Sequence, residues 1–228
     1  MNKAVKHLNS AEIYRVLRDR LTTAVYEPGQ KMKSGGMRSE FGCSISTMRE
    51  ALFRLACDGF LDFEEQKGFR VPAASETTFR EIAAIRVLVE QAGARGSIQH
   101  GGIEWEARLI ASHHKLTHIE DKMRSMRDIE PFIQVWSDAE WEFHDTLTAA
   151  CGSQELRRLH RNIYDRYRQH LTTSHVTKGF RRSTRDEHKA ILDAAIARDA
   201  DLCDERIAAH LYGIFEPPQG QQKNTEAP

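Results

Sequence analysis

Four residues in the second half of the chain have the types and spacing that could bind a metal ion. Glu140 and His144 are four residues apart, so in a helix their side chains would lie one turn apart on the same face. Two later histidines, His188 and His210, each lie among apolar residues at helical spacing. One carboxylate and three imidazoles, brought together inside a helical bundle, would suit a divalent cation such as zinc, nickel, manganese or iron.

Each of these residues also has a simpler interpretation. Glu140 and His144 could form an ion pair on a helix surface. A histidine on the apolar side of a helix is more often a hydrogen-bonded core residue than a ligand, because an unsatisfied buried polar group costs roughly 1–3 kcal/mol. The chain contains 11 histidines, so chance arrangements are easy to find. The residues alone therefore leave a surface pair, an acid/base pair, a core role and a metal site open.

The elements that would carry these residues are a series of amphipathic helices. Ser75 is expected to cap a long helix that ends near Gly101. Further amphipathic stretches predict helices at roughly 103–127, 130–150, 153–173, 183–198 and 199–215. Residues 216–228 are polar and rich in Pro, Gly and Gln, and are predicted to form a disordered tail. The second half is therefore predicted to be an all-α antiparallel bundle.

The first 74 residues show a different pattern, in which three helical stretches precede a hairpin. Ser10 is expected to cap the first helix, and Gly42 separates a weaker helical stretch from the third helix. The third helix begins at Ser44 or Ser46 and ends at Gly59. A polar turn then joins two short strands. This order is typical of a winged helix-turn-helix, whose recognition helix enters the DNA major groove.

A winged helix-turn-helix would bring two sets of side chains to duplex DNA. The start of the recognition helix offers short hydroxyls and an arginine that can reach a guanine or a phosphate. The tip of the hairpin would meet the minor groove or the neighbouring backbone. The predicted DNA-binding residues are therefore Ser44, Ser46, Thr47, Arg49, Lys67 and Gly68. The alternative is a small helical module that packs on the other domain, with its arginine exposed to solvent.

Composition limits the class of protein. Hydrophobic residues make up 40% and charged residues 29%, which is ordinary for a globular protein. The chain is formally neutral, but residues 1–75 contain 12 basic and 9 acidic side chains, a mild excess that suits nucleic acid. Four scattered cysteines without CxxC spacing fit a reducing cytoplasm. No signal-peptide pattern and no run of about 18 apolar residues is present, so we expect a cytoplasmic protein without a membrane partner.

The stretch GCSISTMREALFRLACDGFLDFEEQKGFRV resembles the signature of the GntR family of bacterial transcription regulators. The residues that fall in register with this signature are Gly42, Ser44, Arg49, Glu50, Ala51, Leu52, Leu55, Gly59 and Gly68. Two positions depart from it: Ile45 stands where the family usually has Arg, and Thr47 where it usually has Pro. Loss of that arginine removes one base or phosphate contact, so we expect an operator that differs from the common family site.

Residues 75–215 resemble the FCD ligand-binding domain of the FadR-type GntR subfamily, a bundle of six or seven helices. The matching elements are Arg86 to Glu90, Glu140 with Phe143-His144, Glu187-His188, Ala195 to Asp199, and His210-Leu211. The resemblance implies that Glu140, His144, His188 and His210 are metal ligands, with zinc as the first choice of metal. The first ligand of the family is usually Asp, and Glu140 is longer by one methylene group. This departure is expected to change the preferred metal or weaken its binding.

The resemblance also implies how the protein works. In the family pattern Arg86 faces the effector cavity, where it could pair with a carboxylate; the structural alternative is an ion pair with Glu90. We expect a DNA-binding domain at 1–74 and an effector-binding and dimerisation domain at 75–215. A homodimer would bind a palindromic operator, as a repressor that a small organic acid at the metal site releases.

Two other functions remain open at this point. Three histidines and a carboxylate could activate water in a metal-dependent enzyme. A DNA-binding head and the lack of a further acid/base cluster in the sequence argue against an enzyme. Alternatively, the bundle of a DNA-binding protein could serve only for dimerisation, with structural histidines.

Overall fold

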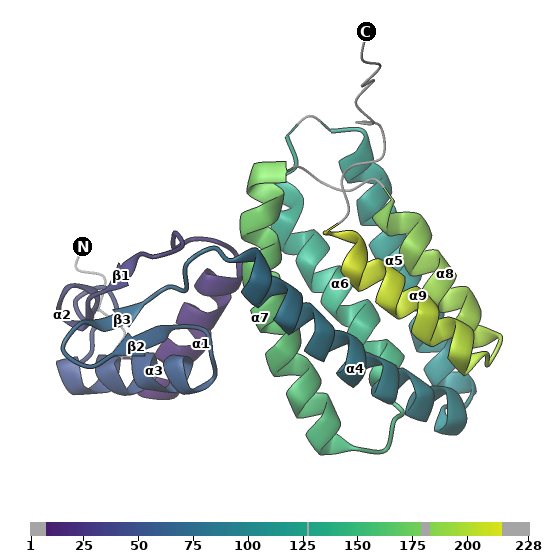
Figure 1. Ribbon diagram of the computed structural model, residues 1–228, viewed down its shortest axis with the longest axis horizontal. Coiled ribbons are helices and arrows are strands. Elements are labelled where there is room, and N and C mark those ends of the chain that lie inside the picture. Colours follow the sequence, from purple (N-terminus) through teal and green to yellow (C-terminus); the bar gives the residue numbers. More distant parts are fainter. Residues whose placement is uncertain (1–7, 127, 179–182, 216–228) are drawn as a thin grey trace, which may run out of the picture. The chain divides into compact units, whose positions relative to one another are not determined.

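The computed structural model describes residues 8–126, 128–178 and 183–215, which form two compact units. One unit takes in the chain up to Phe79 together with Tyr164–Lys178, and the other takes in Arg80–Ile163 with the described residues after Lys178. Within the described residues, the strands belong to the first unit and the second is helical (Figure 1). The predicted fold class, a winged helix-turn-helix followed by an all-α bundle, is confirmed.

The N-terminal unit begins with three helices, α1 (Ser10–Thr22), α2 (Ser34–Met37) and α3 (Ile45–Cys57). The expectation that Ser10 caps α1 was wrong by one residue. Asn9 caps this helix, because its side chain accepts a hydrogen bond of 2.9 Å from the Glu12 backbone N–H while the Glu12 carboxylate accepts one from the Asn9 N–H. Ser44 caps α3, as predicted.

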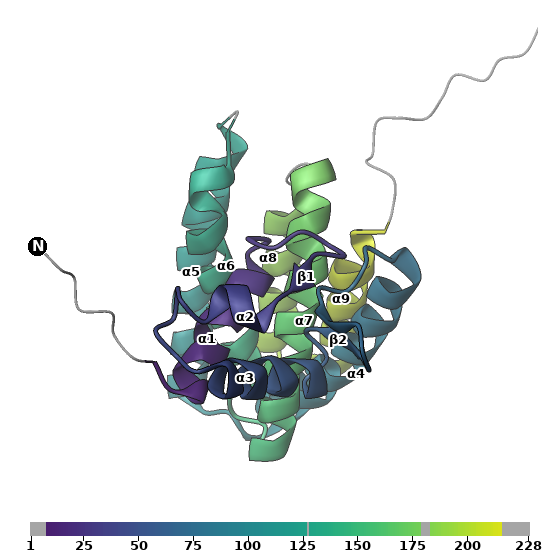
Figure 2. The same ribbon diagram turned by 90° about the vertical axis from the view of Figure 1, so that its left-hand side faces the viewer.

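A small antiparallel sheet completes the DNA-binding head. The predicted hairpin consists of β2 (Asp62–Glu64) and β3 (Gly68–Arg70), and β1 (Lys31–Met32) pairs with the other edge of β3. The sequence did not indicate β1, because two residues are too short to show an alternating pattern. Figure 2 shows α1, α2 and α3 together with the strands of this unit. Their buried side chains form an apolar core, which includes Ile13, Leu17, Met48, Leu52, Leu55, Phe60 and Phe69.

The bundle is built from long helices close to the predicted ranges. These are α4 (Glu76–His100), α5 (Ile103–Arg124), α6 (Ile133–Thr148), α7 (Gln154–Lys178), α8 (Thr184–Ile196) and α9 (Ala200–Gly213), with a short 3₁₀ turn η1 (Glu130–Phe132) before α6. In the unit that starts at Arg80, α5 packs against α6 and α8, and α8 packs against α9. Helix α7 extends past the predicted end at residue 173, because no glycine or proline interrupts it before Gly179.

Helix α4 lies close to the end of α6 because two of its residues have no side chain. A Cβ atom added at Gly93 would lie 2.8 Å from the Thr148 methyl carbon, and one at Gly96 would lie 3.0 Å from the Cα of Cys151. On another face, the Arg95 guanidinium pairs with Asp201 and Asp204 of α9. These contacts hold α4 between its neighbours and fix the position of its buried charged residues.

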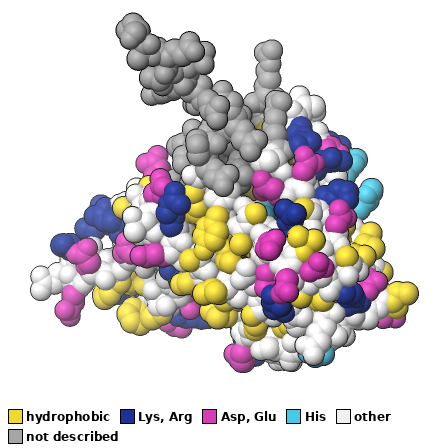
Figure 3. Space-filling model, turned by 45° about the vertical axis from the view of Figure 1, so that its right-hand side comes forward, with side chains coloured by type: hydrophobic (Ala, Val, Ile, Leu, Met, Phe, Trp, Pro, Cys, Tyr) yellow, Lys and Arg dark blue, Asp and Glu magenta, His cyan; other side chains and the backbone are white. Residues whose placement is uncertain are grey.

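The visible face of the molecule carries Lys and Arg interspersed with Asp and Glu among apolar side chains (Figure 3). This mixture agrees with the equal totals of 33 basic and 33 acidic residues. Of the helices that the structure describes, none combines the length and the hydropathy needed to span a bilayer. The predicted tail, 216–228, lies outside the described residues.

Candidate functional site

The four candidate metal ligands come together inside the bundle. Glu140 and His144 are on α6, His188 is on α8 and His210 is on α9. Each residue offers one possible ligand atom, a ring nitrogen or a carboxylate oxygen, and these four atoms all lie within 4.8 Å of one another. All four residues are buried. The rings of His188 and His210 are closest, with centroids 4.5 Å apart. Three helices that are distant in sequence therefore present a carboxylate and three imidazoles to one point.

The apolar stripe of each helix explains this convergence. Each candidate ligand occupies a position at helical spacing from buried residues of its own helix, so the packing that buries those residues also turns the ligand inward. The buried neighbours are Phe143, Leu147, Ile191, Ala195, Ile207 and Leu211. The interpretation of Glu140 and His144 as a surface pair is excluded, since their exposed fractions are 2% and 0%.

Arg86 of α4 lies beside this cluster and is fully buried. Its Nε is 3.2 Å from a carboxylate oxygen of Glu90, and its Nη2 is 3.6 Å from an oxygen of Glu140. The internal ion pair that the sequence left open is therefore present. The same guanidinium also adjoins a candidate metal ligand, which is where an arginine that binds an acidic effector would have to be.

Protonation states in the cluster favour metal binding. Burial lowers the pKa of His144 to about 3 and also lowers the pKa of His210, so both imidazoles are neutral at pH 7. Burial favours the neutral carboxyl of Glu90, but interactions with His144 and with the Arg86 guanidinium outweigh it and hold the pKa of Glu90 well below its usual range. The neutral forms of His144 and His210 are the forms in which an imidazole coordinates a cation, and the ionised Glu90 beside His144 adds negative charge next to the cluster.

Three residues around the cluster were not assigned a role from the sequence. Glu120 of α5 is fully buried, with Oε1 3.0 Å from Nδ1 of His188. Glu187 of α8 lies with Oε2 2.9 Å from Nδ1 of His210. His160 of α7 lies with Nε2 3.3 Å from Oε2 of Glu90. For Glu120 a signal existed, since an acidic residue stands within the apolar stripe of an amphipathic helix.

The residues predicted to bind DNA lie at the start of α3 and at the tip of the hairpin. Ser44, Ser46, Arg49 and Lys67 are exposed, and Thr47 and Gly68 are half-buried. The Ser44 hydroxyl accepts a hydrogen bond of 3.0 Å from the Thr47 backbone N–H, so it caps α3. Contact of these six residues with DNA remains a prediction.

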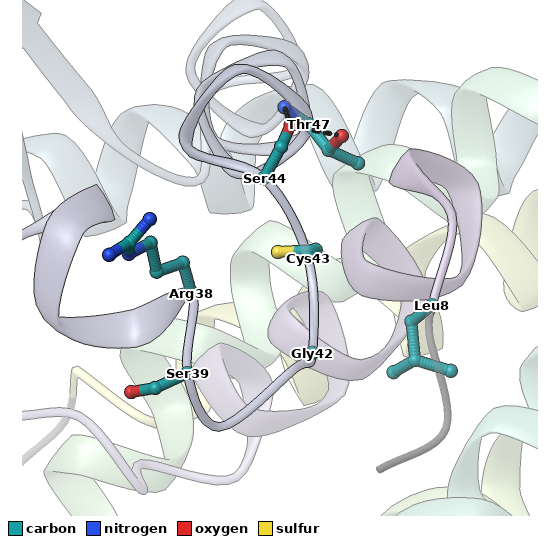
Figure 4. A pocket seen from close by; sticks show the side chains of 7 residues that line it. All are labelled: Leu8, Arg38, Ser39, Gly42, Cys43, Ser44 and Thr47. Carbon is teal, nitrogen blue, oxygen red and sulfur yellow. Dashed lines mark hydrogen bonds between the residues drawn. The ribbon is translucent and has the colours of Figure 1, made fainter.

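Two open pockets border the start of α3. Figure 4 shows one of them, with Arg38 and Ser39 on one side and Cys43, Ser44 and Thr47 on the other. Arg38 was not predicted from the sequence, and its exposed guanidinium lies near the N-terminal end of α3, where a DNA phosphate could bind. The second pocket runs along the helix and is lined by Ile45, Ser46, Arg49, Glu50, Phe53, Phe63 and Phe69.

Comparison with known families covers both parts of the chain. Residues 9–71 match the gntR family of bacterial regulatory proteins, and residues 81–213 match the FCD domain. An uncharacterised HTH-type transcriptional regulator, BphR of Paraburkholderia xenovorans, is 34% identical over 80% of this chain and 74% of its own length. The HTH-type transcriptional repressor GlaR of Escherichia coli is 27% identical over 90% of this chain and 93% of its own length.

Solved structures show the same fold at low sequence identity. Escherichia coli McbR/YncC gives a TM-score of 0.72 at 20% identity, covering 90% of this chain and 94% of its own. A GntR regulator from Rhodococcus sp. RHA1 gives a TM-score of 0.70 at 20% identity, with the same coverage. The sequence relatives BphR and GlaR are named as transcriptional regulators and the family model is that of bacterial regulatory proteins, so the chain is a regulator, which agrees with the expectation that it is not an enzyme. It belongs to the GntR family of bacterial transcription regulators, in the group that carries a C-terminal FCD domain.

Proposed function

We propose that this regulator is a homodimeric repressor whose affinity for a palindromic operator is controlled by a small organic acid bound at a metal site in the helical bundle. Glu140, His144, His188 and His210 hold the divalent metal, with zinc as the first choice and nickel, manganese or iron as alternatives. The observation that carries the proposal is the convergence of these four buried side chains within 4.8 Å. Three imidazoles and one carboxylate form a ligand set that suits such cations.

The arrangement around the ligands supports an acidic effector. A bound divalent cation supplies a position where an oxygen of a carboxylate can coordinate. Arg86 offers a guanidinium beside Glu140, so a carboxylate that entered there would meet a fixed positive charge. The ion pairs with Glu90 and Glu140 hold this guanidinium in place before the effector arrives. The bound cation and the Arg86 guanidinium both favour an anionic effector. Neither group distinguishes among dicarboxylates, sugar acids, amino acids and aromatic acids.

The head supports operator binding through α3 and the hairpin. One recognition helix covers only a half-site, so two heads related by twofold symmetry would bind a palindrome. An effector changes operator affinity only if it binds the two arrangements of the heads with different affinity, and this coupling is reciprocal. Repression agrees with the names of two relatives in Escherichia coli, the transcriptional repressors GlaR and RspR.

The proposal is tested by metal analysis followed by a ligand screen. Purified protein is stripped with a chelator, titrated with zinc, nickel, manganese and iron(II), and screened by thermal shift against carboxylic acids with and without the metal. An operator is obtained by selection from random duplex DNA. We expect one metal ion per chain, and an acid that raises the melting midpoint only with metal and weakens operator binding.

His188→Ala serves as the ligand-removal variant, and His114→Ala, at an exposed position of α5, is its matched control. The first should lose metal and the acid response, while the second should keep both. Wild-type protein that binds none of these metals would overturn the metal-site proposal. If the protein binds metal but no acid alters its affinity for the operator, the effector proposal is wrong. The alternative, a bundle that serves only for dimerisation, would then be favoured.

A further inference from the structure

In each of the three candidate histidine ligands, the ring atom Nδ1 faces a carboxylate. Nδ1 of His188 lies 3.0 Å from Oε1 of Glu120, and Nδ1 of His210 lies 2.9 Å from Oε2 of Glu187. Nδ1 of His144 makes a close contact with Oε1 of Glu90. The three carboxylates come from α4, α5 and α8, so this pattern does not arise from one helical repeat. Every candidate imidazole therefore has its own acidic partner on the same ring atom.

This pattern determines which ring atom is available to a metal. An ionised carboxylate can only accept a hydrogen bond, so Nδ1 of a neutral histidine beside it must carry the proton. The lone pair is then on Nε2. Nε2 of His188 is buried and has no hydrogen-bond partner among the described residues. Nε2 of His144 lies 3.7 Å from Oε1 of Glu140, the fourth candidate ligand.

Glu120 is the most informative of the three carboxylates. It is fully buried, and within the described part of the chain the basic side chain at ion-pair distance from it is the His188 imidazole, 3.0 Å away. The indole N–H of Trp136 lies 3.5 Å from the same Oε1, while Oε2 is buried and has no hydrogen-bond partner among the described residues. Glu90, by contrast, has the Arg86 guanidinium beside it. Burying a carboxylate without a cationic partner is costly, which raises the question of what compensates the charge of Glu120.

We propose that Glu120 is a positioning residue for the metal centre, which acts through His188. Its carboxylate holds the tautomer in which Nε2 is available, fixes the plane of the ring and raises the basicity of the ligand. A dication on Nε2 then compensates the charge of Glu120 through the imidazole. Glu90 and Glu187 do the same for His144 and His210. This inference rests on the proposed metal site and goes beyond its four ligands.

The test compares metal affinity with stability in the Glu120→Gln variant. Glutamine keeps the shape and an acceptor for the Nδ1–H but removes the charge. Competition titration with a chromophoric chelator should show zinc binding weakened by about ten- to hundredfold. The metal-free variant should be at least as stable as metal-free wild type in urea, because an uncompensated buried charge has been removed. Cobalt(II) absorption should report an altered ligand field.

Glu104→Gln, at an exposed position of the same helix, is the matched control and should keep wild-type zinc affinity. Glu187→Gln is the second variant in case Glu120→Gln does not fold, and it should also bind zinc more weakly. Equal zinc affinity in wild type and in the folded variants would overturn this inference while leaving the metal site intact. Absence of zinc binding by wild type would instead overturn the metal-site proposal itself.

Discussion

Glu140 shows how one side chain can have two partners at the candidate metal centre. Its carboxylate lies 3.6 Å from the Arg86 guanidinium and 3.7 Å from Nε2 of His144. The family pattern usually has the shorter aspartate here. With one more methylene group, the carboxylate of this chain lies close enough to interact with the arginine as well as with the histidines. We therefore expect metal and effector binding to be coupled through Glu140 and Arg86.

Arg86 is expected to be essential for folding as well as for ligand binding. Arg86→Met leaves Glu90 and Glu140 buried without their guanidinium, and should lower the free energy of unfolding by roughly 3–5 kcal/mol. Arg95→Met on the same helix removes a half-exposed guanidinium and should cost less than about 1 kcal/mol. Urea denaturation measures both variants. Equal losses would contradict the assignment of Arg86 to a buried ion-pair network.

Metal-free protein should become less stable in mild acid. The folded state keeps His144 neutral, with its pKa lowered from 6.5 to about 3, so below pH 6.5 the unfolded chain binds a proton that the folded chain does not. The free energy of unfolding should therefore fall by about 2 kcal/mol between pH 7 and pH 5. The lowered pKa values of His210 and Glu90 act in the same direction.

Urea denaturation with a chelator present, at pH 7 and at pH 5, measures this effect. Among the described residues, the charged and titratable groups around the His144 ring are Arg86, Glu90, Glu140, His188 and His210. The His144→Gln variant removes one proton-binding group from the unfolded chain and should lose less stability over the same interval. A wild-type protein equally stable at both pH values would contradict the prediction.

Helix α3 has a buried face and an exposed face with different roles. Its buried residues, Met48, Ala51, Leu52 and Leu55, hold the head together. The exposed face carries Ser46 and Arg49 without adding to that core. Substitutions on the exposed face should therefore alter DNA binding with little effect on folding.

Arg49→Ala should weaken operator binding by roughly 1–3 kcal/mol and relax the preference at one base pair if the guanidinium contacts a base. A phosphate contact would instead weaken all sequences alike and lower the salt dependence. Fluorescence anisotropy with operator variants at several salt concentrations distinguishes these cases. Arg54→Ala removes the same charge from the last turn of α3 and is the control. Equal losses of operator affinity in Arg49→Ala and Arg54→Ala would contradict a specific role of the start of α3 in DNA binding.

At the scale of the whole molecule, α7 is one of two described helices, with α4, that have residues in both compact units. Its first part, up to Ile163, groups with the bundle and its second part, from Tyr164, groups with the DNA-binding head. His160 lies in the first part and contacts Glu90, which also contacts the candidate ligand His144. This chain of contacts links α7 to the candidate metal centre.

His160→Leu should therefore reduce the effect of metal on DNA binding without removing either activity. We expect wild type to show a difference in operator Kd between zinc and chelator, and the variant to show a smaller difference with similar zinc affinity. Anisotropy titrations measure the two Kd values. If the variant shows the same difference in operator Kd between zinc and chelator as wild type, coupling through His160 is excluded.

The protein should sediment as a dimer with twice the chain mass of 26.1 kDa. Its operator should contain two half-sites about one helical turn apart, and inserting about 5 bp between them should weaken binding by placing the half-sites on opposite sides of the duplex. Analytical ultracentrifugation and gel shift test these two expectations. A monomer that binds a single half-site as tightly as the full operator would contradict both.

The sequence by itself predicted the helices and the winged head, because these depend on periodicity and on capping residues close together in the chain. The four candidate ligands were assigned by the resemblance to the FCD domain, since the residues alone left other roles open. The sequence indicated that His188 and His210 are on the inner faces of their helices. Only the tertiary structure decided which side chains meet there. Glu120 and His188 are 68 residues apart, and Glu90 and His144 are 54 apart. Pairing at such separations depends on how the helices pack, which no local pattern encodes.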